Sequence, residues 1–270
     1  MTLERDRSLM AFRLVIGATL GALLWKVMYF VVFTEIYFEV PLTQRLFPAF
    51  FESAATFAGS YAGVVVTLVI LLLARQGSLR RWLALAALAV VSILCVHQGS
   101  YNDATFTTAW WTLLWSAWFA GRMAASDDRL LERGARLSRA ILAMILLGAA
   151  VGKWTAEYWS GQVLYEIYFT ERDFWFFNAL RTNVGPDTLR EIATWYSRAV
   201  IVVESLCGLT LWMLLSRLAA VVGMAVCGAI VLLSNFYLVS VLLSVAGLAG
   251  VGLLHTAPKA GAGREEAVLR

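Results

Sequence analysis

The sequence predicts an all-α membrane protein, a polytopic bundle of about eight transmembrane helices. Apolar residues make up 60% of the 270-residue chain and charged residues only 15%, with a mean hydropathy of +0.73. An ordinary soluble domain is about half apolar and about a quarter charged. The apolar residues gather in runs long enough to cross about 30 Å of hydrocarbon as helices, and the alternation typical of a barrel strand is missing.

The predicted spans follow one another in a single domain over residues 1–256, each near the ~20 residues that a bilayer requires. Short polar segments separate them, and the last two are divided only by Ser234, Asn235 and Phe236. Residues 257–270 are small and charged, so we expect a flexible cytoplasmic tail there. The spans are expected at residues 9–33, 59–74, 82–96, 105–120, 137–151, 196–215, 218–233 and 237–254.

Basic residues between the spans predict the orientation. Most of them fall on one side when the spans cross alternately, and the positive-inside rule makes that side the cytoplasm for both termini. The opposite loops are mostly acidic, and we expect the protein in the cell (inner) membrane. The net charge of +4 is explained in this way, so nucleic acid is not an expected partner. The cytoplasmic basic residues are Arg5, Arg7, Arg13, Arg75, Arg80, Arg81, Arg122, Arg129, Arg133, Arg136, Arg139, Arg217, Lys259, Arg264 and Arg270.

An aromatic segment over residues 154–195 is expected on the outer face. Aromatic side chains favour the bilayer interface, so this amphipathic loop predicts helices that lie on the outer surface or dip into it. Gly185 and Pro186 predict a turn near its middle, and Asp187 is the expected N-cap of a helix over 188–195. The segment either covers a substrate as a lid or only stabilises the fold.

Few ionisable residues lie within the predicted spans, and each is a functional candidate because it is costly to place in lipid. Lys26 lies in the outer half of the first span, Lys153 at the outer end of the fifth, and Glu204 two turns into the sixth. His97 ends the third span on the outside and is followed closely by Asp103. Their similar depth predicts that they share one cavity.

Two interpretations of these residues stay open. A lysine among apolar side chains loses hydration, which makes its neutral amine available as a base. A carboxylate opposes that change, so the state of Lys153 depends on whether it pairs with Glu157, Glu204 or Asp103. His97 is the other group that moves protons near neutral pH. In the alternative, each lysine pairs with one acid in a buried ion pair that only fixes the register of the helices.

Three segments resemble the vitamin K-dependent gamma-carboxylase-like, or HTTM, family of membrane proteins. Residues 152–161 read GKWTAEYWSG, similar to the family motif that closes a middle helix with a lysine before an acidic residue, a tryptophan and a glycine. Residues 100–106, SYNDATF, look like the family's Asn-Asn-His segment, and Glu204 fits a glutamate of the next major span. The resemblance covers most of the chain, from the first span to the eighth.

The resemblance implies a role for Lys153. The matching lysine of the carboxylases is the base that drives oxygenation of vitamin K hydroquinone, so a quinone is the expected cofactor. The family histidine falls at Asp103 and its asparagine neighbour at Asn102, with His97 a helical turn away as its substitute. The large lumenal domain of the animal enzymes is missing, so we do not expect a propeptide-guided protein carboxylase.

The leading hypothesis is a membrane enzyme that uses a quinone or another lipid-soluble substrate at an outer-facing cavity. The alternative is a non-catalytic membrane subunit, or an accessory or maturation factor of a larger membrane complex. A transporter is less favoured, because no inverted repeat is found. The lipid bilayer and a membrane-complex partner are the expected partners, and no metal site is expected. The catalytic candidates are Lys153, His97, Asp103 and Asn102; the substrate-binding candidates are Lys26, Glu204, Glu157, Trp159 and Tyr101.

Overall fold

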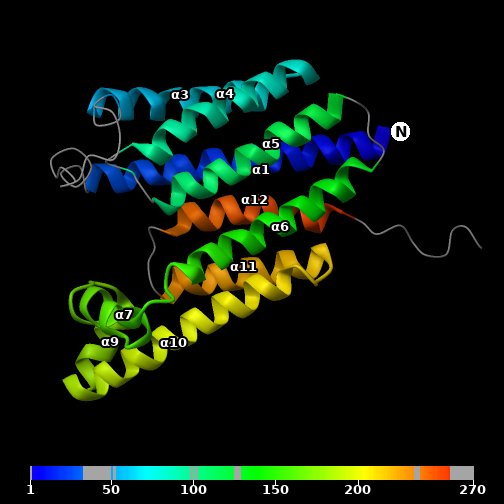
Figure 1. The fold of residues 1–270 in the computed structure, drawn as a ribbon. Coiled ribbons are helices and arrows are strands. Elements are labelled where there is room, and N and C mark those ends of the chain that lie inside the picture. Colours follow the sequence, from blue (N-terminus) through cyan, green and yellow to red (C-terminus); the bar gives the residue numbers. More distant parts are fainter. Residues whose placement is uncertain are drawn as a thin grey trace, which may run out of the picture.

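The computed structural model describes residues 2–32, 50, 53–97, 100, 103–124, 129–233 and 238–255. All regular structure in these ranges is helical (Figure 1), which confirms the predicted all-α bundle. The long helices are α1 (Thr2–Val32), α3 (Ala54–Leu73), α4 (Gly77–Val96), α5 (Ala104–Ala124), α6 (Leu130–Val151), α10 (Pro186–Leu211), α11 (Ser216–Leu233) and α12 (Val239–Leu254). Between α6 and α10 lie α7 (Ala156–Trp159), α8 (Gln162–Leu164), the π-helix η3 (Tyr165–Thr170) and α9 (Trp175–Asn183).

Each predicted span coincides with one long helix. Six of these helices are long and apolar enough to cross a membrane, namely α1, α3, α4, α6, α10 and α11. Of the other two, α12 is apolar but has only 16 residues. By contrast, α5 has 21 residues and is not among the six, and its Thr105, Thr108, Thr112 and Ser116 are all buried. These hydroxyls hydrogen-bond inside the bundle, as in the 2.7 Å contacts of Thr112 with Thr19 and of Thr105 with Ser240.

The predicted boundary at residue 196 is wrong. The outer helix expected over 188–195 and the span expected over 196–215 form the single helix α10, because nothing in the sequence between them breaks a helix. The helix begins at Pro186, whose fixed φ suits the first turn. Its N-cap is therefore Gly185 rather than Asp187, and α10 begins nearly three turns before the predicted start of the span.

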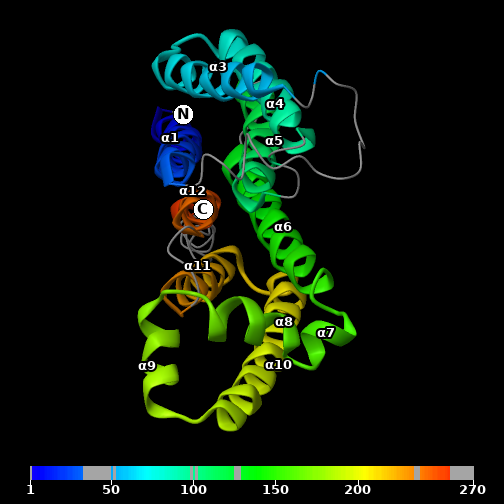
Figure 2. The same cartoon turned by 90° about the vertical axis from the view of Figure 1, so that its left-hand side faces the viewer.

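The helices form two layers, seen end-on in Figure 2. One layer contains α1, α12 and α11, and the other contains α4, α5, α6 and α10. Contacts of α1 with α5, of α12 with α5 and α6, and of α11 with α6 and α10 join the layers, while α3 covers one edge against α4 and α1. The short helices α7, α8 and α9 lie at the opposite edge, against α10 (Figure 2).

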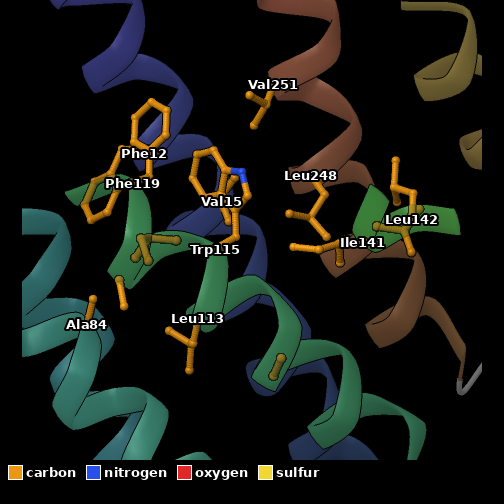
Figure 3. Close-up of a cluster of buried hydrophobic side chains, with 14 of the residues drawn as sticks. Phe12, Val15, Ala84, Leu113, Trp115, Phe119, Ile141, Leu142, Leu248 and Val251 are labelled. Carbon is orange, nitrogen blue, oxygen red and sulfur yellow. The ribbon is translucent and has the colours of Figure 1, made fainter. Parts of the chain in front are cut away.

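A large apolar cluster fills the space between the layers (Figure 3). At its centre, the fully buried Trp115 stacks on Phe119 with ring centroids 4.4 Å apart. The Trp115 indole donates a hydrogen bond to the Gly134 carbonyl at 3.0 Å, so its polar atom is satisfied inside the core. A Cβ at Gly134 would lie 2.6 Å from the Phe119 ring, which shows how closely α6 approaches α5 here.

The glycines of α12 allow other helices to come equally close. A Cβ at Gly247 would lie 2.7 Å from the Ala18 side chain, and one at Gly252 would lie 2.6 Å from the Ser216 carbonyl oxygen. In a membrane, such close packing replaces the hydrophobic effect as the main attraction between helices. Gly17, by contrast, faces open space.

The basic helix ends gather at one end of the molecule. The start of α1 and the end of α12 lie at the end opposite to α7 and α9 (Figure 1). The α3–α4, α5–α6 and α10–α11 junctions lie with them. These junctions carry the arginines that predict a cytoplasmic face, so the chain path agrees with the charge pattern. The α7–α9 end is called the outer end below.

Candidate functional site

Lys153 and Glu204 form an ion pair between the outer end of α6 and the C-terminal half of α10. The Lys153 Nζ lies 2.6 Å from Glu204 Oε2 and 3.3 Å from the carbonyl oxygen of Ala149. The Glu204 side chain is 4% exposed and that of Lys153 is 24% exposed. The carboxylate is thus held inside the bundle, while the ammonium is reached from the outer end.

The sequence positions this pair by simple helical periodicity. Glu204 belongs to a buried stripe of α10 that also contains Ser197, Ile201, Gly208 and Leu211 and faces α6. Gly208 brings the two helices together, because a Cβ there would lie 2.6 Å from Leu147 Cγ. The end of α6 tightens after Gly152, and its orphan carbonyls are partly satisfied by the Lys153 ammonium.

Lys26 and Asp103 form a second ion pair, between α1 and the start of α5. Lys26 Nζ lies 2.6 Å from Asp103 Oδ2, and the side chains are 7% and 13% exposed. The other carboxylate oxygen accepts a hydrogen bond from the Thr105 backbone N–H at 2.8 Å, so Asp103 also caps α5. This pair therefore links α1 to a helix N-terminus, where a negative charge is favoured.

His97 lies at the end of α4, next to the start of α3. It is 2% exposed, its Nε2 lies 3.0 Å from the Ser53 carbonyl oxygen, and its ring packs on Phe57 with centroids 5.2 Å apart. The structure does not bring His97 to Lys153, whose contacts are with Glu204 and Ala149. The candidates expected in one cavity are instead divided between two ion pairs and a buried histidine.

Glu157 and Trp159 lie on α7 near Lys153, but they point to different surroundings. Glu157 is exposed, and hydrogen bonds from its own backbone N–H and from the Thr155 hydroxyl lower the pKa of its carboxyl. Trp159 is 40% exposed and stacks on Trp154, with centroids 5.5 Å apart and ring planes 16° apart. Of the three acids considered as partners of Lys153, Glu204 is thus the one in contact. Tyr101 and Asn102 lie outside the described residues.

Tyr158 is a site residue that the sequence analysis missed. It is half-buried on α7, and the pKa of its phenol is raised by burial first, then by Tyr168 and by the nearby Glu204 charge. Its carbonyl accepts a hydrogen bond from Ser197, which lies two turns before Glu204 on the same face of α10. The position of Tyr158 inside the Lys153 motif was a usable clue, because that motif closes onto α10.

The other aromatic residues of the outer segment form their own small core. Phe169 and Phe177 are fully buried, at 0% exposure, and they pack with Phe174, Leu189 and Ala193. The expected interfacial character belongs to the indoles outside this core, because Trp154, Trp159, Trp175 and Trp195 are all at least 40% exposed. The segment is therefore a packed unit with a tryptophan-rich surface.

The residues around Lys153 fit the headgroup of a quinone. Such a headgroup is a flat apolar ring with oxygen atoms that accept hydrogen bonds. Trp154 offers an exposed indole face that is fixed in place by its hydrogen bond to Ser205 Oγ at 3.1 Å, one residue from Glu204. The partly exposed Lys153 ammonium is the neighbouring donor. Within the described residues, no three His, Cys, Asp or Glu side chains gather as metal ligands.

No protein-family model, curated protein or solved structure matches this chain. The resemblance to the HTTM proteins therefore stays a prediction carried by the motif residues, above all Lys153 and Glu204.

Proposed function

We propose that this chain is an integral protein of the cell (inner) membrane that binds a quinone or another lipid-soluble substrate at its outer end, beside Lys153. The observation that carries the proposal is the Lys153–Glu204 pair, a buried carboxylate joined to a partly exposed ammonium. Ionisable residues within membrane-spanning helices commonly mark substrate or proton pathways. The exposed Trp154 and Trp159 give the same place a flat apolar surface.

In this proposal, Lys153 acts as a base together with Glu204. The Lys153 ammonium must lose a proton before it can accept one from a substrate. The Glu204 carboxylate oxygen, 2.6 Å from Lys153 Nζ, is the nearest acceptor for that proton. Transfer of that proton leaves a neutral amine on Lys153 and a neutral carboxylic acid on Glu204. The amine then takes a proton from a substrate hydroxyl. A bound quinone supplies the redox chemistry.

The first experiment is mass spectrometry of the lipids and quinones that copurify with the protein in mild detergent. Lys153→Met is compared with wild type and with Lys26→Met, which breaks the other lysine–carboxylate pair. We expect wild type and Lys26→Met to retain a quinone and Lys153→Met to lose most of it. Equal retention by all three variants, or no quinone in the wild type, would contradict the proposal. Thermal unfolding of each variant shows that it is folded.

The alternative function is a non-catalytic subunit or maturation factor of a membrane complex. The observation in its favour is that both lysines in the spans are matched by carboxylates, as in a purely structural pairing. The exchanged variant Lys153→Glu/Glu204→Lys separates the two. A structural pair tolerates the exchange, so a protein partner that copurifies with the wild type would be retained. If Lys153 is instead a base beside the substrate, the exchange removes the amine from that position, and quinone retention would be lost.

A further inference from the structure

Arg198, near the middle of α10, lies between two exposed indoles where α7 packs against this helix. Its guanidinium carbon is 5.5 Å from the ring centroid of Trp159 and 5.3 Å from that of Trp195. The Trp159 side chain is 40% exposed and that of Trp195 is 62% exposed. The Nε of Arg198 donates a hydrogen bond to the Trp159 carbonyl at 3.1 Å, which fixes the plane of the guanidinium.

The charge of Arg198 is not neutralised by the protein. Among the described residues, no carboxylate forms an ion pair with it, and Nε is the nitrogen that makes the hydrogen bond. The two Nη atoms of a guanidinium form a fork that matches the oxygen atoms of a phosphate. The indoles on either side stabilise the cation without satisfying those donors.

Arg198 lies among indoles, which favour the level of lipid headgroups. It lies six residues before Glu204, which is about 9 Å along the helix toward the outer end. Indoles favour the boundary between hydrocarbon and headgroups, and Trp154 and Trp175, both 57% exposed, belong to the same outer end. A phosphate at that level meets a preformed cationic fork rather than a flexible lysine.

We propose that Arg198, between Trp159 and Trp195, binds the phosphate of an anionic phospholipid of the outer leaflet. The acyl chains of that lipid lie along the apolar surface of α10, where Val202, Val203 and Leu206 are exposed. The proposal rests on the membrane placement of the proposed function but not on the chemistry at Lys153.

The test measures lipid binding by native mass spectrometry of the protein released from nanodiscs that contain phosphatidylglycerol and phosphatidylcholine in equal amounts. Arg198→Gln is compared with wild type and with Arg190→Gln. Arg190 is the matched control, because it lies two turns earlier on α10 and its guanidinium lies over a single ring, that of Tyr165, at 5.3 Å. We expect wild type and Arg190→Gln to prefer phosphatidylglycerol, and Arg198→Gln to bind it about fivefold more weakly, the usual effect of one basic residue.

Two further arms separate this site from simpler explanations. Trp195→Ala keeps the charge of Arg198 and its hydrogen bond to Trp159 but removes one of the two indoles. We expect it to reduce the preference for phosphatidylglycerol less than Arg198→Gln does. Wild-type lipid retention is also measured with inorganic phosphate added at millimolar concentration. Unchanged preference in Arg198→Gln, equal loss in Arg190→Gln, or displacement of the lipid by inorganic phosphate would overturn the proposal. Quinone retention by Arg198→Gln is expected to equal that of the wild type, so failure here leaves the role of Lys153 separately testable.

Discussion

The two lysine–carboxylate pairs have the same 2.6 Å separation but different surroundings. Lys26 and Asp103 are both nearly buried, and Asp103 has the second task of capping α5. In the other pair the carboxylate is buried, whereas 24% of the Lys153 side chain is exposed. A buried ion pair contributes little net stability because of its desolvation cost, but the loss of one partner leaves an unpaired charge.

Lys153→Met is therefore expected to lower the free energy of unfolding by about 3 kcal/mol, because it leaves Glu204 charged and unpaired. Adding Glu204→Leu is expected to recover most of that loss. The measurement is a double-mutant cycle by thermal unfolding in detergent. Arg136→Met is the control, since its pair with Glu132 on α6 is mostly exposed and its loss is expected to change stability far less. Additive losses in the cycle would show that Lys153 and Glu204 do not stabilise each other.

Tyr158 gives a pH-dependent prediction. Its phenol has a raised pKa in the folded protein, so the unfolded chain loses this proton first as the pH rises. The contribution to stability is fully present below the unfolded value of about 10 and is lost as the pH rises above it. Tyr158→Phe has no such proton, so its unfolding temperature is expected to fall less than that of the wild type between about pH 9 and 11. Tyr165→Phe, which leaves Tyr158 in place, is the control, and equal slopes for wild type and Tyr158→Phe would refute the assignment.

At the scale of elements, the α7–α9 segment is a unit with its own core that is fastened to α10. Thr194 donates a hydrogen bond to the Ser160 carbonyl at 2.9 Å, beside the contacts that Ser197 and Arg198 make with α7. Gly161 makes the close turn possible: its φ is +79°, and a Cβ there would lie 2.5 Å from Thr194 Cα. This turn holds Tyr158 and Trp159 against α10, where their carbonyls accept hydrogen bonds from Ser197 and Arg198.

Gly161→Ala is accordingly expected to loosen the outer segment and to destabilise the protein by about 1–3 kcal/mol, from backbone strain and the clash with α10. Limited proteolysis of the purified protein should then cut within residues 155–185 faster than in the wild type. Gly185→Ala is the matched control, because Gly185 has φ −69° and nothing within 4 Å of an added Cβ. Equal cutting of both variants would show that Gly161 does not hold the segment.

Periodicity and composition were enough to predict every long helix, because each one is a continuous apolar run or a run with one polar face. They could not predict that α10 continues through residue 196, since the change from an interfacial to an apolar surface occurs without a break in the backbone. Similar depth along the chain also suggested one shared site for Lys26 and Lys153. The position of a residue in the sequence indicates its depth in the membrane but not which helices lie beside it. The structure places Lys26 and Lys153 in different helix pairs.

At the scale of the whole molecule, the two-layer arrangement places the arginine-bearing α3–α4, α5–α6 and α10–α11 junctions at one end and the tryptophan-rich segment at the other. This distribution is what a bilayer with the cytoplasm on the basic side requires. Helix α5 lies within one layer and α12 within the other, each between neighbouring helices. Buried hydroxyls and glycines make their contacts, in place of an apolar surface that faces lipid. Their weaker hydropathy or shorter length is thus a consequence of burial.

The orientation predicts which positions a membrane-impermeant maleimide reaches in intact cells. In a variant whose Cys95, Cys207 and Cys227 are replaced by serine or alanine, Asp187→Cys at the start of α10 should be labelled from outside. Arg136→Cys, whose native side chain in its ion pair is 62% exposed, should be labelled only after the cells are opened. The reverse pattern would invert the topology.

The position of α12 has a consequence for biogenesis. This helix contacts α1, α5, α6 and α11, and six consecutive residues from Gly247 to Gly252 are buried on all its sides. Because α12 is synthesised after those four helices, the surfaces that it covers in the finished bundle have no partner until it is made. We therefore expect a chain interrupted before Val239 to leave the α12-facing surface of α1 uncovered.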